Sequence, residues 1–290
     1  MTTPVLINAP DDAAWQLIMR RIVSERCVPF LGAGASLGFE GEVGLPSGGQ
    51  LSKMIADECQ YPGDDPYDFL RVAEFYRMKF DLDDLHQFIA QKLLVGANPS
   101  RVHRVLAKLP LRYVLTTNFD DLMEEAFRKA GKRPRAFVYE LGGKPEDIPL
   151  GTKDEPIVYK LHGSLDKLNT LIATEDRVID FVTALLLGDP PLPPSIASLF
   201  AEDSFLFVGY GLKDWNVRVM LRALRSRAGR GQQRVNFALQ RRPQRDNIAQ
   251  EWEQSVMFML KTDDIRSYDM DAVDFAKTLE DRARAEGLIK

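Results

Sequence analysis

Four short clusters of glycine and polar residues hold the side chains that could do chemistry in this chain. Each cluster comes directly after an apolar, β-rich run. They are Gly32-Ala33-Gly34-Ala35-Ser36, Thr117-Asn118-Phe119-Asp120, His162-Gly163-Ser164 and Gly209-Tyr210-Gly211. Because ligands of open parallel sheets bind beyond the carboxyl ends of the strands, we expect the four clusters to line one cleft.

The first cluster has the composition of a phosphate-binding turn. Gly32 and Gly34 would let backbone amides approach an anion closely, and Ser36 adds a hydroxyl donor. A full dinucleotide fingerprint needs a third glycine where Leu37 stands, so the motif is incomplete. A plain tight turn explains the same residues.

The second and third clusters each contribute a polar side chain at a strand end. Asn118 can hold a sugar hydroxyl or a water molecule, but it or Asp120 can equally cap the following helix. His162 can accept a proton near neutral pH, but a buried, hydrogen-bonded histidine beside a turn fits as well. The other two histidines, His86 and His103, lie in helical patterns, and we expect them to pack rather than to act.

Two features of the second half of the chain have two interpretations each. Gly209-Tyr210-Gly211 would allow the backbone to approach a flat group such as adenosine, or it is simply a turn that leads into a helix from Lys213. The stretch from Arg218 to Arg245 contains nine arginines and no acidic residue. It is either a solvated face or part of an interface.

Apolar periodicity predicts the elements that must position these clusters. Strands alternate with helices, which favours an α/β fold: a Rossmann-like parallel sheet with helices on both faces. We expect residues 1–290 to form a single domain with a helical insertion at about 47–108. Strands are predicted over 28–31, 113–116, 137–139, 157–161, 204–208, 235–239 and 256–260, and helices over 13–23, 175–187, 213–228 and 271–284.

Composition and charge exclude several classes of protein. The 290 residues are 45% hydrophobic and 28% charged, as in ordinary globular proteins. A net charge of −4 argues against direct nucleic-acid binding. Two cysteines cannot form a four-cysteine zinc site, and they indicate a reducing compartment. With no secretory signal and no apolar run near ~20 residues, we expect a cytoplasmic protein without a membrane span or a metal.

In their order along the chain, the four clusters and Gly44-Leu45-Pro46 resemble the signature blocks of the sirtuin fold, from about Cys27 to Leu260. The resemblance is closer to the sirtuin-like domains of bacterial antiphage-defence systems than to the protein deacylases. Deacylases carry a zinc ribbon after the His-Gly block, whereas no cysteine follows Cys59 here. They also have Asp-Phe-Arg after the Gly-x-Pro block, where this chain has Ser47-Gly48-Gly49.

This resemblance implies an NAD hydrolase, which cleaves NAD to nicotinamide and ADP-ribose and acts as a toxic effector by depleting NAD. It implies that Asn118 holds the nicotinamide ribose and the attacking water, and that His162 is the general base or the partner of a ribose hydroxyl. The remaining NAD contacts would come from Gly32, Ala33, Gly34 and Ser36 at the pyrophosphate, Asp120 near the nicotinamide, and Gly209, Gly211 and Leu212 at the adenosine half. Because the nicotinamide of NAD is already cationic, an oriented ribose, a water and a base suffice without a metal.

Three other functions stay open at this point. An NAD-dependent protein deacylase would use the same asparagine and histidine, a non-catalytic nucleotide-binding assembly module would need neither, and a hydride-transfer enzyme would need the missing third glycine. Because an unregulated NAD hydrolase would kill its host, we expect a homo-oligomer or a partner chain, such as a sensor or a motor ATPase of the same defence system. The arginine-rich stretch is the candidate interface.

Overall fold

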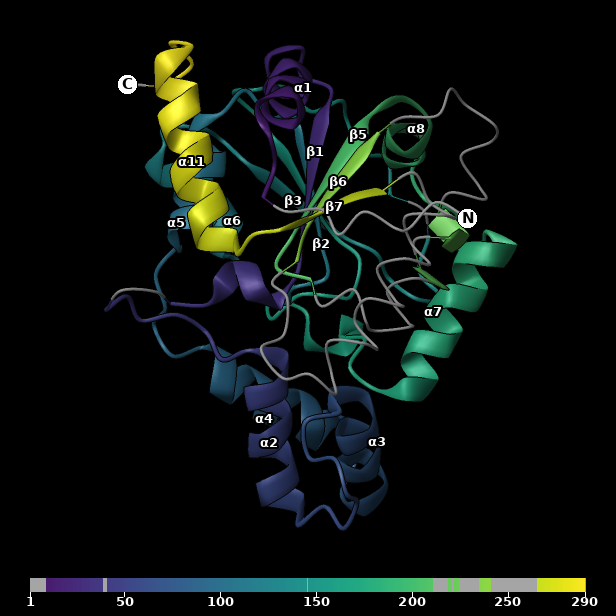
Figure 1. The fold of residues 1–290 in the computed structure, drawn as a ribbon. Helices are drawn as coiled ribbons and strands as arrows, with labels where there is room; N and C mark the ends of the chain where they lie inside the picture. Colours follow the sequence, from purple (N-terminus) through teal and green to yellow (C-terminus); the bar gives the residue numbers. More distant parts are fainter. Residues whose placement is uncertain are drawn as a thin grey trace, which may run out of the picture.

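A seven-stranded parallel sheet forms the centre of the molecule, in the order β3-β4-β2-β1-β5-β6-β7 (Figure 1). The computed structural model describes residues 9–38, 41–144, 146–210, 219–220, 222–224, 235–240 and 265–289. The strands are β1 (Cys27–Leu31), β2 (Tyr113–Thr116), β3 (Arg135–Val138), β4 (Ile157–Lys160), β5 (Ser204–Val208), β6 (Asn236–Gln240) and β7 (Ile265–Asp269). Every strand pair is parallel, which confirms the predicted fold class.

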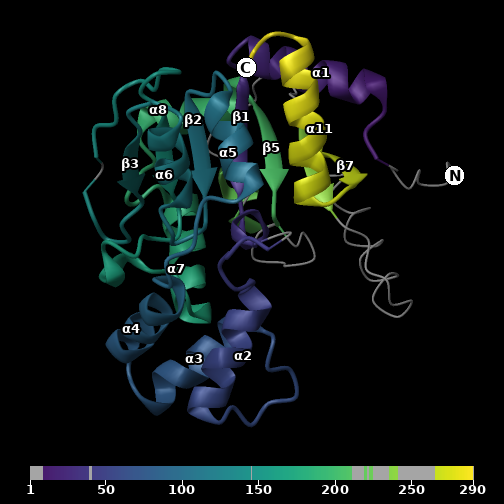
Figure 2. The same ribbon diagram turned by 90° about the vertical axis from the view of Figure 1, so that its left-hand side faces the viewer.

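Helices cover both faces of this sheet (Figure 2). One face carries α1 (Asp12–Val23), α5 (Arg101–Lys108), α6 (Leu122–Lys129) and α11 (Ala272–Ala285), and the other carries α7 (Glu175–Leu187) and α8 (Pro194–Glu202). Because both faces are covered, β1 is buried along its whole length. Its residues alternate between the two cores, with Leu31 packing on the first face and Phe30 on the second.

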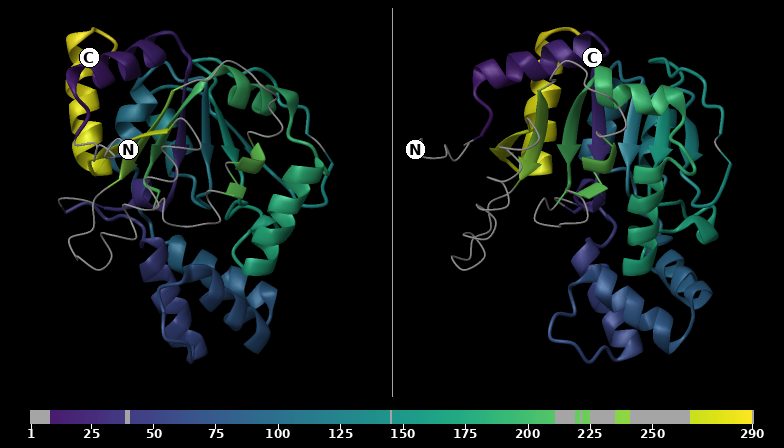
Figure 3. Two further views of the ribbon diagram at one scale, coloured as in Figure 1. Left: turned by 45° about the vertical axis from the view of Figure 1, so that its right-hand side comes forward. Right: turned by 90° about the vertical axis from the view of Figure 1, so that its right-hand side faces the viewer.

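Three helices form a lobe beyond the carboxyl ends of the strands (Figure 3). They are α2 (Gly48–Cys59), α3 (Phe69–Lys79) and α4 (Leu82–Leu93), and they share a separate apolar core that includes Ile55, Val72 and Ile89. Side-chain caps begin them, with a capping box between Ser47 and Gln50 at α2. The single-domain organisation and the boundaries of the insertion stay predictions.

The remaining differences from the predicted elements have local causes. The proline-rich stretch contains a helix, α8, because Pro194 occupies its first turn, where the missing amide hydrogen has no cost. Strand β7 was not predicted, and the predicted strand 256–260 lies outside the described residues. The predicted helix 213–228 is described at 219–220 and 222–224, where it is helical, and Arg222 is the described member of the arginine-rich stretch. No helix within the described residues is long and apolar enough to cross a membrane.

Candidate active site

The described residues of all four clusters lie at one edge of the sheet, at the carboxyl ends of β1, β2, β4 and β5. Strand β1 lies between β2 and β5, so the sheet grows from β1 in both directions. This reversal is the switch point at which ligands of open α/β sheets bind. The structure therefore brings Gly32, Thr117 and Gly209 together at the switch point, with His162 one strand further along.

The glycines of the first and last clusters let two loops pack backbone against backbone. A Cβ atom on Gly34 would lie 2.8 Å from Cα of Gly209, and one on Gly209 would lie 2.2 Å from the amide nitrogen of Ala35. The amide groups of Gly32, Gly34 and Ala35 donate to the carbonyl oxygens of Val208, Gly209 and Gly32, at 3.0, 2.9 and 2.9 Å. These three amides are thus used within the fold, in the 3-10 turn η1 (Ala33–Ser36) and its junction with the β5 loop.

The side-chain amide of Asn118 has a fixed orientation. Its Nδ2 atom lies 3.1 Å from the carbonyl oxygen of Gly32, which can only accept, and 3.1 Å from Oγ of Ser36. The hydroxyl of Ser36 in turn donates to Oδ2 of Asp120 at 3.0 Å. Both amide hydrogens of Asn118 are therefore committed, and its Oδ1 atom remains as an acceptor.

Asp120 uses both of its carboxylate oxygens within the chain. Its Oδ1 atom accepts from the amide of Leu122, the first residue of α6, at 3.1 Å. Its Oδ2 atom accepts from Ser36. With both carboxylate oxygens engaged by the chain, Ser36 and Asp120 orient Asn118 in this structure.

His162 follows β4, the strand next to β2, at the register position that corresponds to Asn118. Thr116 and Lys160 are paired between β2 and β4, and the two candidate catalytic residues each follow two positions later. Burial lowers the pKa of His162 to about 4, so its imidazole is neutral at pH 7. Its Nε2 atom is buried without a hydrogen-bond partner among the described residues, and its ring meets Phe181 edge-on at 5.1 Å.

Tyr210 packs into the core rather than offering a surface for stacking. Its ring contacts Phe30 edge-on at 5.4 Å, and its hydroxyl lies 2.7 Å from Oγ1 of Thr117. Burial raises the pKa of this phenol. It therefore helps to join the ends of β2 and β5. Of the three predicted adenosine contacts, Gly211 and Leu212 lie outside the described residues.

Comparison with known proteins identifies the family. Residues 112–259, about half of the chain, match the SIR2-like domain, a segment that includes Asn118, His162 and Gly209. The chain belongs to the SIR2-like domain family. The predicted sirtuin-like family is thus confirmed.

Several curated relatives are similar to this SIR2-like chain. The NAD(+) hydrolase ThsA of Cytobacillus dafuensis is 27% identical over 210 residues, which cover 71% of this chain and 40% of the relative. The protein of the same name from Bacillus cereus strain MSX-D12 is 25% identical over 241 residues, covering 82% and 48%. Defense-associated sirtuin 2 of Bacillus subtilis is 23% identical over 162 residues, covering 54% and 15%. The chain spans less than half the length of these relatives.

A buried ion pair supports the Asn118 segment of the SIR2-like site, and sequence reasoning missed it. Nζ of Lys160 lies 3.1 Å from Oε1 of Glu124, with side chains only 1% and 4% exposed. The same nitrogen donates to the carbonyl oxygen of Asp120 at 2.5 Å. Burial raises the pKa of Glu124, and the charge of Lys160 opposes that rise. The available signal was a lysine at the end of an otherwise apolar strand.

A second contact that the sequence analysis did not predict joins the glycine turn to the start of α5. The hydroxyl of Ser100 donates to the carbonyl oxygen of Ala35 at 2.6 Å, and the amide of Ser100 donates to Nδ1 of His103 at 3.2 Å. Both side chains are buried, and burial lowers the pKa of His103. The Ser-x-x-His spacing at the start of a helix was the sequence signal for this cap.

No metal-binding cluster is found in the part of the SIR2-like chain that the structure describes. Those residues contain no group of three or more histidine, cysteine, aspartate or glutamate side chains placed to hold an ion. The two cysteines, Cys27 and Cys59, are free and buried. The absence of a required metal remains a prediction.

Proposed function

We propose that this chain is an NAD hydrolase that cleaves NAD to nicotinamide and ADP-ribose in a bacterial antiphage-defence system. The observation that carries the proposal is the fixed amide of Asn118 at the switch point, with a neutral His162 that has an unpartnered Nε2 atom at the end of the neighbouring strand. Four relatives that match this chain carry the name NAD(+) hydrolase, which supports the same activity.

The proposed reaction needs orientation, a water molecule and a base. The bond between C1′ of the ribose and the nicotinamide nitrogen breaks, and its electron pair leaves with the already cationic nicotinamide. The resulting charge on the ribose is oxocarbenium-like, as in glycoside cleavage. Oδ1 of Asn118 orients the water or a ribose hydroxyl, and Nε2 of His162 accepts the proton that the water loses as its oxygen bonds to C1′.

The hydrogen bonds of the site refine the roles that the resemblance implies for NAD binding. Because the amides of Gly32 and Gly34 donate within the fold and the Gly209 loop fills the space beside them, these glycines would serve NAD by shaping the turn in which Ala33 would contact its pyrophosphate. Ser36 and Asp120 would act by orienting Asn118 rather than by touching NAD. Gly209, Gly211 and Leu212 remain the proposed adenosine contacts.

The cellular role follows from this chemistry and is also proposed. Depletion of NAD would make the chain the toxic effector of the defence system, and such an effector must be restrained until it is needed. We propose that a homo-oligomer or a partner chain, such as a sensor or a motor ATPase, provides this control. The arginine-rich stretch from Arg218 to Arg245 is the proposed contact surface, because it is cationic in an acidic chain.

Nicotinamide release by Asn118→Ala and His162→Gln variants tests the activity. We expect each change to lower the rate by ~10²–10⁴-fold, the usual effect of losing a proton-transfer or orienting group. Thermal melting should change little. The matched controls are Asn98→Ala, at an exposed asparagine, and His86→Gln, at a histidine with a similarly lowered pKa of about 4.

Each alternative outcome of this experiment points to a different function. Full activity in either folded variant would exclude the role given to that residue. Removal of acyl groups from lysine peptides without nicotinamide release would indicate a deacylase. Binding of NAD without either reaction would indicate an assembly module.

A further inference from the structure

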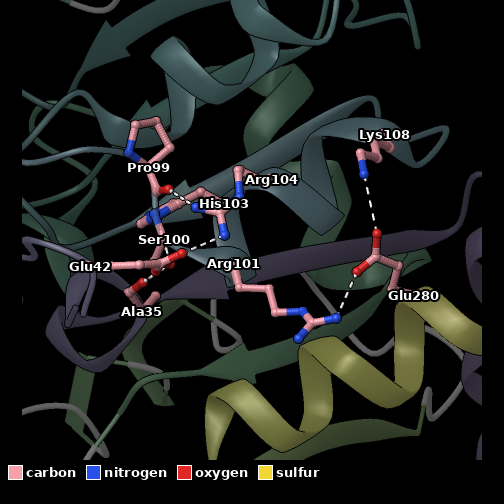
Figure 4. Close-up of polar contacts among 9 residues, drawn as sticks. All are labelled: Ala35, Glu42, Pro99, Ser100, Arg101, His103, Arg104, Lys108 and Glu280. Atoms are coloured by element: carbon pink, nitrogen blue, oxygen red, sulfur yellow. Dashed lines mark hydrogen bonds and ion pairs between the residues drawn. The ribbon is translucent and has the colours of Figure 1, made fainter. Parts of the chain in front are cut away.

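A cavity of about 340 Å³ lies beside helices α5 and α11, outside the proposed NAD site. Its walls carry charged side chains from both helices and from the loop before α2, as Figure 4 shows. The lining residues are Glu42, Arg101, Arg104, Val105, Lys108, Val273 and Glu280. Such a volume falls near the lower end of the range for small-molecule sites.

The cations of the cavity outnumber its carboxylates. Arg101, Arg104 and Lys108 recur at helical spacing, so they share one face of α5. Glu280 alone pairs with Arg101 at 3.1 Å, Lys108 at 3.2 Å and Arg284 at 2.8 Å. Burial would raise the pKa of Glu280, but hydrogen bonds from Arg101 and Lys108 outweigh it and lower the pKa. One ionised carboxylate therefore serves three cations.

Glu42 pairs with the third cation of the cavity, Arg104. Only one of the two carboxylate oxygens of Glu42 has a partner among the described residues. Its Oε1 atom lies 2.5 Å from Nη2 of Arg104, whose Nη1 donates to the carbonyl oxygen of Pro99 at 2.6 Å. Its Oε2 atom is buried and has no hydrogen-bond partner among the described residues. A buried acceptor without a donor costs free energy, so an anion that satisfies more of its oxygens can replace Glu42 here.

We propose that this cavity binds a small oligophosphate anion, which displaces Glu42 from Arg104 and lies against Arg101, Arg104 and Lys108. Guanidinium groups suit phosphate because their planar donors match its oxygens in pairs. At a rise of ~1.5 Å per residue, the three cations extend over ~10 Å along α5. That length fits two linked phosphates better than a single one.

The position of the cavity suits a regulatory ligand. Ser100, which precedes Arg101, holds Ala35 of the glycine turn through a hydrogen bond of 2.6 Å (Figure 4). A ligand that shifts the start of α5 therefore acts on the turn that carries Ser36. This regulatory part rests on the proposed NAD hydrolase activity, whereas the binding part does not.

Calorimetric titration of the full chain with inorganic pyrophosphate at low salt tests the site. We expect Arg104→Ala to weaken binding by about tenfold, the effect of losing one charged hydrogen-bonding partner. Glu42→Gln should tighten binding by about threefold, because it removes the competing, partly exposed ion pair between Glu42 and Arg104. Arg133→Ala is the matched control: this arginine is exposed, pairs with Glu155 far from the cavity and should change nothing.

The two cavity variants are expected to change the affinity for pyrophosphate in opposite directions, which distinguishes a binding site from a purely structural ion-pair network. A purely structural ion-pair network predicts that both changes lower the melting temperature and that neither affects pyrophosphate binding. The proposal is overturned if pyrophosphate does not bind at millimolar concentration, or if its affinity is the same in the wild type and in both cavity variants. If pyrophosphate binds at the glycine turn instead, the affinity will likewise ignore Arg104 and Glu42.

A second measurement tests the regulatory part. Pyrophosphate should change the rate of nicotinamide release in the wild type and in Arg133→Ala, but not in Arg104→Ala. A rate that stays constant while the cavity is occupied overturns the regulatory part. If the wild type releases no nicotinamide, the proposed activity fails, and the calorimetric titration still decides whether the site exists.

Discussion

Lys160 and Glu124 form a nearly dry ion pair, 3.1 Å from Nζ to Oε1, directly under the segment that carries Asn118. Lys160 also donates to the carbonyl oxygen of Asp120. Its buried ammonium group is therefore held by an ion pair and by a hydrogen bond. The pair ties the end of β4 to the first turn of α6. The Asn118 segment is thus built on a rigid, charged support.

Breaking this support should cost much stability. Lys160→Met leaves the carboxyl of Glu124 buried without its partner, which should lower the free energy of unfolding by ~3–5 kcal/mol. Urea denaturation measures the loss. The matched control is Lys129→Met on α6, the helix that carries Glu124. The partner of Lys129, Glu125, is partly exposed, and this ion pair should contribute under ~1 kcal/mol. Equal losses in the two variants would show that Lys160 is not a structural support.

The close approach of two loops gives a second prediction, at Gly209. Gly209→Ala combines a left-handed backbone, at φ +78°, with a Cβ atom 2.2 Å from the amide nitrogen of Ala35. Gly142→Ala has the same kind of strain, at φ +69°, with open space around the new atom. The control should lose ~1–2 kcal/mol of stability, whereas Gly209→Ala should lose more and also weaken NAD binding. If the two variants lose the same stability and bind NAD equally well, the contact between the two loops does not have this role.

The elements around the site were predictable because their sequences carry one dominant signal. Strand β1 reads as apolar since Phe30 and Leu31 face two different cores, and glycines mark its end. Strand β7 has no such signal: Ile-Arg-Ser-Tyr-Asp is short and polar, and its two exposed residues, Arg266 and Asp269, obscure the burial of its Ile265 and Tyr268. Its pairing with β6 supplies the stabilisation that its own sequence does not show.

The clusters at the strand ends were predictable as well, but not the contacts between them. Ser36 and Asp120 are 84 positions apart, and Ser100 and Ala35 are 65 apart. Nothing local in the sequence reveals that a serine donates to a distant carboxylate rather than to a ligand. For the same reason, the strand pattern pointed to Asn118 and His162, while Lys160 was counted only as part of a strand.

The buried imidazole of His162 makes stability depend on pH. Its pKa of about 4 lies below the ordinary histidine value, so between ~6.5 and 4 the unfolded chain binds a proton that the folded chain does not. Stability should therefore fall as the pH drops through this window, by ~2 kcal/mol between pH 7 and pH 5 from this residue.

Chemical denaturation at pH 7 and pH 5 measures this effect. His162→Gln should lose about 2 kcal/mol less than the wild type over the same interval. His86→Gln should reduce the pH dependence in the same way, because burial also lowers the pKa of His86 to about 4, but it should leave nicotinamide release unchanged. A wild type and a His162→Gln variant with the same pH dependence would contradict the buried, neutral imidazole.

Asp120→Asn separates an orienting role from direct contact with NAD. Oδ2 of Asp120 makes the hydroxyl of Ser36 donate, which in turn makes that hydroxyl accept from Nδ2 of Asn118. In the variant, the new amide keeps its oxygen toward the amide of Leu122 and turns a donor toward Ser36. The hydroxyl of Ser36 must then accept from both amides, and it loses the carboxylate oxygen to which it donated.

Two amide donors then share one hydroxyl oxygen, which weakens the hold on Asn118, and its amide cannot flip in response because its oxygen would face the carbonyl oxygen of Gly32. We therefore expect Asp120→Asn to lower kcat for NAD cleavage by ~10–10²-fold, through lost orientation, with KM and the melting temperature nearly unchanged. Asp121→Asn is the matched control, since the side chain of Asp121 makes no capping hydrogen bond to α6. If Asp120→Asn instead raises KM and leaves kcat intact, Asp120 contacts NAD itself, as the sirtuin resemblance implies, and the orienting chain from Asp120 through Ser36 is not what sets Asn118.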